Sequence, residues 1–249
     1  MAVAVVTGAS SGLGREVALL LAARGEHVVA VARTEESLNQ LAASSPRIEA
    51  VAADLATSAG RARLLGAVGD VDILVNSAGL GASGRFVAMP ADESARLVAV
   101  NVAALTELTG RLLPGMVSRG SGRVLNVAST AAFQPGPGMA VYFATKAYVL
   151  SLTEALAEEL RGTGVSATAF CPGAFTSGFQ AVAGIESSKL VNGRTLPTSR
   201  EMAIAALAAM DRGVVVAVPG ALNKLGAFAT RLAPRPVVRR MVARIQSDM

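Results

Sequence analysis

The sequence predicts an α/β domain with a doubly wound parallel sheet of seven strands and helices on both faces. Short apolar segments alternate with helical segments along the chain, and a glycine-rich turn follows the first apolar segment. Strands that are apolar on both faces are buried on both sides, which requires a layer of helices above and below the sheet. Seven strands and the turn after the first one favour this open sheet over a closed eight-fold barrel.

Seven short segments, most of them rich in valine or alanine, have the composition of buried strands. They are Val3–Thr7, Glu26–Ala32, Ile48–Ala53, Asp72–Asn76, Arg123–Ala128, Val165–Phe170 and Val214–Val218. Helical periodicity covers the segments between them, namely Arg15–Arg24, Glu35–Ala43, Ala59–Val68, Glu93–Arg119, Val141–Arg161 and Thr198–Asp211. The last helix begins with Thr198, followed three residues later by Glu201, which is a capping-box pattern.

The composition excludes several classes of protein. The chain has 249 residues, 52% of them hydrophobic and 16% charged, which suits one large core. The single cysteine, Cys171, excludes an intramolecular disulfide. With His27 as the only histidine, no metal site is expected, because structural zinc usually takes four His or Cys ligands. Without a basic leader or an apolar run of about 18–20 residues, a cytoplasmic location is expected.

The net charge of +5 is located on the last 26 residues. Six basic side chains there face only Asp248, whereas the preceding residues carry 17 basic and 17 acidic side chains. A charge-balanced body argues against nucleic-acid binding. We therefore expect a domain over residues 1–222 and a basic amphipathic extension over 223–249. Three roles remain open for the extension: covering the domain, pairing with another subunit, or peripheral contact with an anionic membrane.

The glycine-rich turn Thr7–Gly14 lies between the first predicted strand and the first predicted helix. Its glycines, Gly8, Gly12 and Gly14, allow a close backbone approach, and a helix N-terminus offers free N–H groups to a pyrophosphate. The spacing is Gly-x3-Gly-x-Gly and meets the usual dinucleotide fingerprint, Gly-x-Gly-x-x-Gly, only approximately. We expect nucleotide binding here, and a purely structural turn is the alternative.

The same segment contains a rival motif. Residues 8–12, with Ser10 at the centre, match the Gly-x-Ser-x-Gly nucleophile elbow of α/β hydrolases. That chemistry needs a histidine base and an acid later in the chain. His27 opens the second strand, at the edge of the sheet opposite the strand tops, so we do not favour a hydrolase.

A tyrosine and a lysine, Tyr142 and Lys146, stand four residues apart in the predicted helix Val141–Arg161. Side chains at this spacing lie on one face of a helix. A phenol has a pKa of about 10, and a nearby ammonium stabilises the phenolate and lowers that pKa towards neutrality. The chain has only two Tyr and three Lys, so the pair indicates proton transfer. The alternative is a packed tyrosine beside a solvated lysine, which is how we interpret Tyr148.

Taken together, the motifs resemble the short-chain dehydrogenase/reductase family, in its short single-domain branch, over about residues 3–220. The resemblance implies a Rossmann-like fold. In chain order, Thr7–Gly14 resembles the TGxxxGxG cofactor turn, and Asp54-Leu55 resembles the pair that contacts adenine. Asn76–Gly79 resembles the NNAG segment, with Ser77 in place of its second Asn. Pro172-Gly173 resembles the PG turn, and Thr176 or Ser177 provides the hydroxyl that follows it. The implied cofactor contacts are Gly8, Ser10, Ser11, Gly12, Leu13, Gly14, Arg33, Asp54, Leu55, Asn76, Ala78, Gly79, Tyr142, Lys146, Pro172, Gly173 and Thr176.

The resemblance also implies four catalytic roles. Tyr142 would donate a proton to a carbonyl oxygen during reduction, or accept it from an alcohol. Ser129, thirteen residues earlier, would hydrogen-bond the same oxygen. Lys146 would bind the nicotinamide ribose and lower the pKa of Tyr142. Asn101 would hold a water that links Lys146 to solvent.

Cofactor choice depends on the end of the second strand. An acidic residue there would bind the ribose hydroxyls of NAD and repel a phosphate. This chain instead has Arg33, which can pair with and stack over a 2′-phosphoadenosine. Glu35 and Glu36 follow, but they fit the first turn of a helix. We expect NADP(H) to be preferred over NAD(H).

Two segments, 130–140 and 174–197, should line the substrate pocket, and the second is long enough to be a lid. Their apolar side chains are Phe133, Met139, Phe175, Phe179, Val182, Ile185 and Leu190; of these, Phe133, Phe175 and Phe179 are the substrate contacts that we predict, together with Ser129. The predicted function is hydride transfer between NADP(H) and a small, lipophilic carbonyl compound or secondary alcohol. We expect the protein to form a homodimer or homotetramer. A catalytically idle NADP(H)-sensing protein on the same fold is the alternative.

Overall fold

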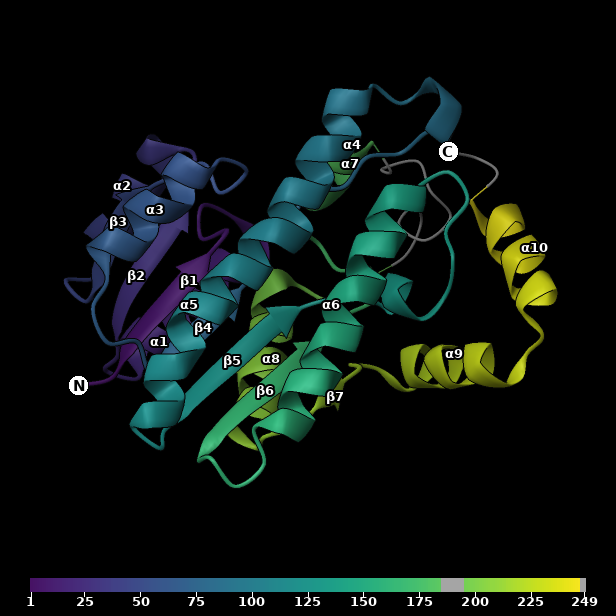
Figure 1. Cartoon of the computed structure of the whole chain (residues 1–249). Coiled ribbons are helices and arrows are strands. Elements are labelled where there is room, and N and C mark those ends of the chain that lie inside the picture. Colours follow the sequence, from purple (N-terminus) through teal and green to yellow (C-terminus); the bar gives the residue numbers. More distant parts are fainter. Residues whose placement is uncertain (185–194, 247–249) are drawn as a thin grey trace.

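The computed structural model describes residues 1–184 and 195–246 of the chain (Figure 1). The predicted pocket residues Ile185 and Leu190 lie outside these ranges, as do residues 247–249 at the C-terminus.

One parallel sheet of seven strands forms the centre of the domain, in the order β3-β2-β1-β4-β5-β6-β7 (Figure 1). The strands are β1 Val3–Thr7, β2 His27–Ala32, β3 Ile48–Ala52, β4 Ile73–Asn76, β5 Gly122–Val127, β6 Val165–Phe170 and β7 Val216–Ala217. The order reverses between β1 and β4, which is the switch point of a doubly wound sheet. The predicted fold class is therefore confirmed.

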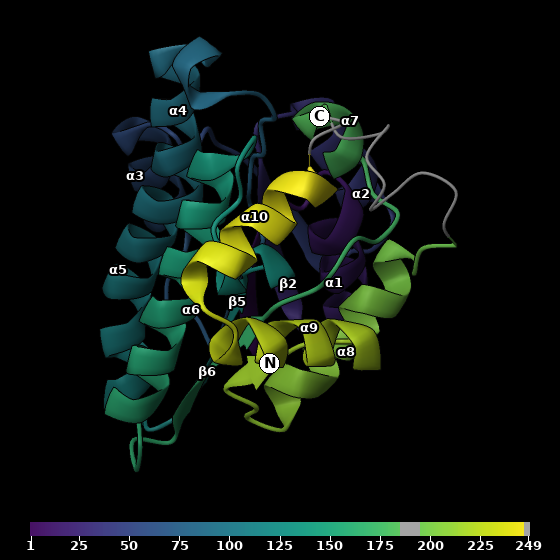
Figure 2. The ribbon, with the colours of Figure 1, turned by 90° about the vertical axis from the view of Figure 1, so that its right-hand side faces the viewer.

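Helices cover both faces of the sheet, and Figure 2 shows the two layers on either side of the strands. The helices are α1 Gly12–Ala23, α2 Glu35–Ala43, α3 Ser58–Ala67, α4 Ala91–Val98, α5 Leu105–Ser118, α6 Ala140–Glu159, α7 Phe179–Ala183, α8 Ser199–Asp211, α9 Ala221–Leu232 and α10 Arg235–Ile245. Short turns of other helical types are η1 Phe86–Ala88, η2 Ala99–Ala104 and η3 Thr130–Phe133. The predicted capping box of Thr198 and Glu201 is present at the start of α8.

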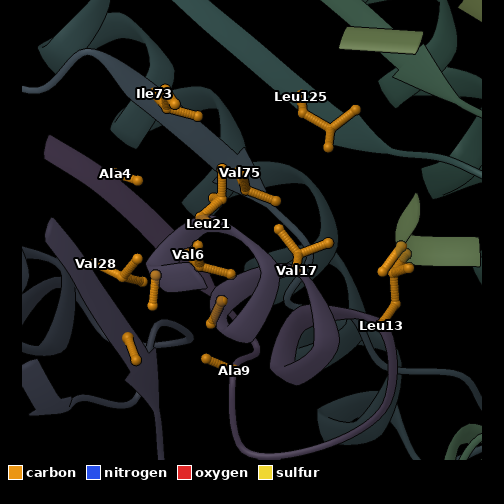
Figure 3. Packing of buried hydrophobic residues seen from close by; sticks show 14 of the residues in the cluster. Ala4, Val6, Ala9, Leu13, Val17, Leu21, Val28, Ile73, Val75 and Leu125 are labelled. Carbon is orange, nitrogen blue, oxygen red and sulfur yellow. The ribbon is translucent and has the colours of Figure 1, made fainter. Parts of the chain in front are cut away.

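Alternation along each strand divides the core into two layers. Ala4 and Val6 of β1 face the layer of α1, α2 and α8, whereas Val5 faces the layer of α3, α5 and α6. Figure 3 shows the first layer, in which Val17 and Leu21 of α1 lie over β1, β2 and β4. Burial of apolar side chains on both faces stabilises the sheet and fixes where each strand ends.

The predicted helix Glu93–Arg119 is one continuous helical run over Ala91–Ser118, but it is not regular. Its middle, η2, is a wider π-helical turn that contains Asn101. The run spans 28 residues with a hydropathy of 1.2 over its most apolar stretch, so it is long and apolar enough to cross a membrane. In its α5 part, Leu108 and Met116 are fully buried in the layer that packs on the sheet, and 39% of the apolar stretch is buried inside the protein.

The last residues of the chain form two helices, α9 and α10, joined at Ala233 and Pro234. The two halves of the apolar pattern in α10 have different surroundings. Val238 and Val242 are buried, whereas Val237 and Met241 are exposed. The predicted amphipathic extension therefore directs one apolar edge into the protein and the other outwards.

Candidate functional site

A cavity of about 530 Å³ opens at the carboxyl ends of the strands, where a doubly wound sheet binds its ligands. Most of the predicted site residues line it. They are Gly8, Ser10, Ser11, Gly12, Leu13, Gly14, Arg33, Asp54, Leu55, Ala78, Gly79, Ser129, Tyr142, Lys146, Pro172, Gly173, Phe175 and Phe179. Residues that are up to 170 positions apart in the sequence thus meet at one edge of the sheet.

The glycine turn forms a cradle that larger residues would fill. A Cβ atom on Gly14 would lie 2.4 Å from the carbonyl oxygen of Gly8, and a Cβ on Gly8 would lie 2.8 Å from Cα of Ala78. Gly8 also has φ of 70°, which favours glycine. No side chain caps the N-terminus of α1, whose residues Gly12 to Gly14 line the cavity. This arrangement fits the pyrophosphate of a dinucleotide.

The cradle is tied to the next loop by one hydroxyl. Thr7 Oγ1 accepts hydrogen bonds from the backbone N–H groups of Ser77 and Ala78, each 3.0 Å long. The same hydroxyl donates to the carbonyl oxygen of Val75 at 3.3 Å. Ser77, which departs from the family motif, contributes here through its backbone N–H, so the substitution leaves this contact intact.

The end of the cavity where the sequence predicts that adenosine binds combines a cation with a paired carboxylate. Arg33 is exposed and lines the cavity, as does Asp54. Burial alone would raise the pKa of Asp54, but hydrogen bonds from Arg96 and from the Ala56 N–H, with the charges of Arg96 and Arg33, hold it below its usual value. The Asp54–Arg96 ion pair measures 2.8 Å. Asp54 is therefore a charged hydrogen-bond acceptor at neutral pH.

Ser129, Tyr142 and Lys146 come together at the other end. Ser129 is the N-cap of η3, directly after β5, and Tyr142 and Lys146 lie on one face of α6. Lys146 is 6% exposed, its Nζ donates to the carbonyl oxygen of Val127 at 2.8 Å, and it lies 5.8 Å from the centre of the Tyr142 ring. Burial lowers the pKa of Lys146 to about 8.

The expected lowering of the Tyr142 pKa by Lys146 is not found. Burial raises the pKa of Tyr142 to about 12, and a hydrogen bond with the Ser129 hydroxyl only partly offsets it. The ring packs edge-on against Phe143 and lies 5.3 Å from the Phe179 ring, so the phenol has apolar surroundings. Without a cationic ligand beside it, the phenol is protonated at neutral pH and is set up to donate its proton.

Asn101 lies behind this group and does not line the cavity directly. Its Oδ1 accepts from the Leu80 N–H at 2.8 Å, and its Nδ2 donates to the Leu80 carbonyl and to Thr145 Oγ1. A Cβ on Gly79 would lie 3.5 Å from Lys146 Nζ and 3.7 Å from Asn101 Oδ1, so both groups border the hollow left by Gly79.

Three predicted contacts lie elsewhere. Asn76 is 4% exposed and does not line the cavity; its amide donates hydrogen bonds to Thr109 of α5 and to Asn126 of β5. Phe133 packs into the core with Ala132 on the far side of η3, because the tight turn directs successive side chains to different sides. Thr176 pairs with Thr198 in an isolated bridge, and Ser177 takes the place by the cavity.

Several residues that line the cavity could not be identified from sequence patterns. Gln180 of α7 and Val242 of α10 are two of them, and Gln246, directly after α10, is a third. Arg96, which stabilises the ionised form of Asp54, lies 42 positions from it in the sequence, and only folding brings the two side chains together. Within residues 1–184 and 195–246, no group of three or more His, Cys, Asp or Glu side chains is close enough to hold a metal ion.

Comparison with known proteins identifies a family profile and relatives that agree with one another. The family profile described as short chain dehydrogenase matches residues 2–186. An uncharacterized oxidoreductase of Staphylococcus epidermidis is 36% identical over 176 residues, which cover 69% of this chain and 76% of that protein.

Two solved structures share the fold along most of the chain. A short-chain dehydrogenase from Sphingobium yanoikuyae in complex with NADPH has a TM-score of 0.83 and 34% identity, covering 93% of this chain and 95% of that one. A 3-ketoacyl-(acyl-carrier-protein) reductase from Brucella melitensis complexed with NADH has a TM-score of 0.78 and 33% identity, covering 87% and 95%. The protein belongs to the short-chain dehydrogenase/reductase family, whose members are oxidoreductases with a nicotinamide cofactor.

Proposed function

We propose that the protein is an NADP(H)-dependent oxidoreductase that interconverts a lipophilic carbonyl compound and its secondary alcohol. One observation carries the proposal: the cavity has a glycine cradle for a dinucleotide at one end and Ser129, Tyr142 and Lys146 at the other. A nicotinamide dinucleotide bound there supplies or accepts the hydride. The alternative of an idle sensor is not favoured, because the groups needed for proton transfer are all present.

The side chains have complementary roles in this mechanism. The protonated Tyr142 donates its proton to the developing alkoxide oxygen during reduction, and Ser129 positions that oxygen by a hydrogen bond. The Lys146 ammonium holds the nicotinamide ribose and favours the phenolate that remains. Asn101 holds the Leu80 loop and Thr145, which is the neighbour of Lys146 on α6. The apolar neighbours of Tyr142 exclude water from the reacting atoms.

Replacing Tyr142 with Phe should abolish turnover while cofactor binding persists. The substitution removes the proton donor but keeps the ring, so kcat should fall by about 10²–10⁴-fold. Turnover is measured by NADPH absorbance with a panel of ketones, and cofactor binding by NADPH fluorescence. Tyr148→Phe is the matched control, since Tyr148 is 38% exposed and bonds Thr106 at 2.8 Å. Turnover that survives Tyr142→Phe contradicts the mechanism.

Reduction should weaken above about pH 8 as Lys146 loses its proton. Its lowered pKa means that the ammonium is present below this pH and absent well above it, whereas Tyr142, with a pKa of about 12, stays protonated throughout. We expect kcat/KM for NADPH, which reports the pKa values of the free enzyme, to be level near pH 7 and to fall by about tenfold per pH unit above the transition. A profile that is level to pH 10 excludes this role for Lys146.

The preference for NADP(H) rests on Arg33. One structural relative holds NADPH and another NADH, so the fold alone does not decide between the two cofactors. Arg33 lines the cavity next to the adenosine end and can pair with a 2′-phosphate. No carboxylate stands at the tip of β2, which ends at Ala32.

Changing Arg33 to Asp should reverse the cofactor preference. Loss of a charge-assisted pair and introduction of a repulsive charge should lower the ratio of kcat/KM for NADPH to that for NADH by about 10–100-fold. Arg63→Asp, on the exposed side of α3, is the control for net charge. If the ratio of kcat/KM for NADPH to that for NADH is unchanged in Arg33→Asp, Arg33 does not determine the cofactor preference.

A lipophilic substrate is supported by the lining near Tyr142. The apolar side chains there come from four helical elements, η2, α6, α7 and α10, and from loops; they are Leu80, Val100, Met139, Phe143, Phe175, Phe179 and Val242. Among the described lining residues at this end, the one ionisable pair is Tyr142 and Lys146, both assigned to the chemistry. A small polar sugar or a free acid would leave its polar groups unpaired against this surface.

The exposed face of α9 supports peripheral contact with an anionic membrane. Leu222, Leu225, Phe228 and Leu232 are 59–85% exposed and lie on one side of the helix. Lys224, Arg235, Arg239 and Arg240 are exposed on the same two helices, and residues 212–247 contain no acidic side chain. Two copies with this charge would repel one another, whereas an anionic bilayer attracts both the cations and the apolar face.

Vesicle sedimentation tests this contact. The protein should sediment with phosphatidylserine-containing vesicles but not with pure phosphatidylcholine, and high salt should weaken the binding. The double variant Leu225→Ser/Phe228→Ser should lose binding, whereas Phe86→Ser/Val87→Ser, which also removes two exposed apolar side chains, should keep it. Equal binding by all proteins contradicts the proposal. A dimer in light scattering that the first variant dissociates would assign the face to a second copy instead.

A further inference from the structure

The C-terminal helix α10 forms one wall of the cavity beside Tyr142. Val238 and Val242 are 7% and 9% exposed, and they belong to one apolar cluster with Met139 and Phe143. Tyr142 itself packs against this cluster. Figure 2 shows α10 crossing in front of the domain from α6 towards α7. The tail therefore completes the substrate end of the site within a single chain.

Gln246 continues this inner face of α10. Val238, Val242 and Gln246 are spaced by four residues, so they lie along one side of the helix, and the last two line the cavity. Gln246 is 5% exposed. Its carbonyl oxygen Oε1 is buried and has no hydrogen-bond partner among the described residues. A buried amide oxygen that lacks a partner is uncommon in folded proteins and calls for a ligand or a water.

The neighbouring amide in the cavity does not share this property. Both polar atoms of the Gln180 amide are hydrogen-bonded: Nε2 donates to the Phe175 carbonyl, and Oε1 accepts from the Ser177 hydroxyl. Thr168 Oγ1, the other buried side-chain atom without a partner in the described ranges, lies within β6 and does not line the cavity. Of these groups, Gln246 alone offers a free acceptor to whatever occupies the substrate end.

We propose that Gln246 selects substrates that carry a hydrogen-bond donor, a hydroxyl or an amide N–H, separated from the reacting carbonyl by a short apolar stretch. The proposal rests on the oxidoreductase function above and adds the substrate class. Val242 supplies the apolar surface nearest the Tyr142 cluster, and Gln246 lies one helical turn further, about 6 Å along the axis. A donor that lies about 6 Å beyond the part of the substrate in contact with Val242 would pair with Oε1 of Gln246. A purely apolar substrate would leave this oxygen unpaired.

The test compares three series of methyl ketones of increasing chain length, reduced by the full-length enzyme with NADPH. The chains end in a hydroxyl, a methoxy group or a methyl group, which give a donor, an acceptor only, and neither. At one chain length, the hydroxyl should raise kcat/KM about five- to tenfold over the methyl, mainly through KM, and the methoxy should not. An enzyme that reduces none of the ketones refutes the oxidoreductase function itself, whereas turnover without a hydroxyl preference refutes only the role of Gln246.

Variants at position 246 assign the preference to this side chain. Gln246→Leu should abolish it while the methyl series and NADPH fluorescence stay near wild type, and Gln246→Glu, which keeps an acceptor, should retain it. Gln40→Leu, the same change on the exposed side of α2, should leave the preference intact. Binding of the hydroxy-ketone to the NADP⁺ complex, followed by thermal shift, gives a second readout if Gln246→Leu turns over slowly. A preference that persists in Gln246→Leu overturns the proposal.

Discussion

The position of α6 against the sheet is the constraint on which the site depends. Lys146 extends from α6 to the carbonyl oxygen of Val127 at the end of β5. About two turns further along α6, Thr153 accepts a hydrogen bond from the Asn126 amide at 3.0 Å. Both contacts are at least partly buried, where an unmade hydrogen bond costs about 1–3 kcal/mol. They fix the rotation and the height of α6, and therefore the place of the Tyr142 hydroxyl. Asn76 extends the same network to β4 by its 2.9 Å bond to Asn126.

Parallel strands then bring the two halves of the chemistry to one edge. The loops after β1, β3 and β4 surround the cradle, and those after β5 and β6 surround Tyr142. A buried cation in this second group is expensive, which is why the pKa of Lys146 falls to about 8. The desolvation cost of the Lys146 ammonium is tolerated because the charge faces the place where the cofactor is proposed to bind. Burial has the opposite effect on Tyr142 and keeps its proton in place.

Much of the fold could be predicted because it follows from local patterns. The bounds of β1, α2 and β6 match their expected ranges, since turn residues or charged side chains flank these elements directly. The pairing of Tyr142 with Lys146 followed from their four-residue spacing on one helix, whereas Ser129 was implied by the resemblance to the family. Phe133 and Thr176 could not be placed, because a one-residue change in a tight turn reverses the direction of a side chain.

The rest of the site was hidden for a different reason. Gln246 and Arg96 contact parts of the chain that lie far away in the sequence, and no periodicity reports such contacts. The helical spacing of Val238 and Val242 is visible in the sequence, but it left open whether they cover the domain, meet another subunit or contact a membrane. The raised pKa of Tyr142 was equally inaccessible, since desolvation depends on Phe143 and Phe179 in three dimensions.

The use of α10 as a wall has a consequence for the order in which the enzyme matures. Strands β1 to β6 and the nucleotide cradle leave the ribosome well before residues 235–246, so most of the sheet can form while the substrate end is still open. Helix α10 then packs on an already formed surface made of Met139, Phe143 and Ala183. A bulky fusion appended to the C-terminus would meet this closing step, so a tag is better placed at the N-terminus, which lies on the opposite side of the sheet (Figure 1).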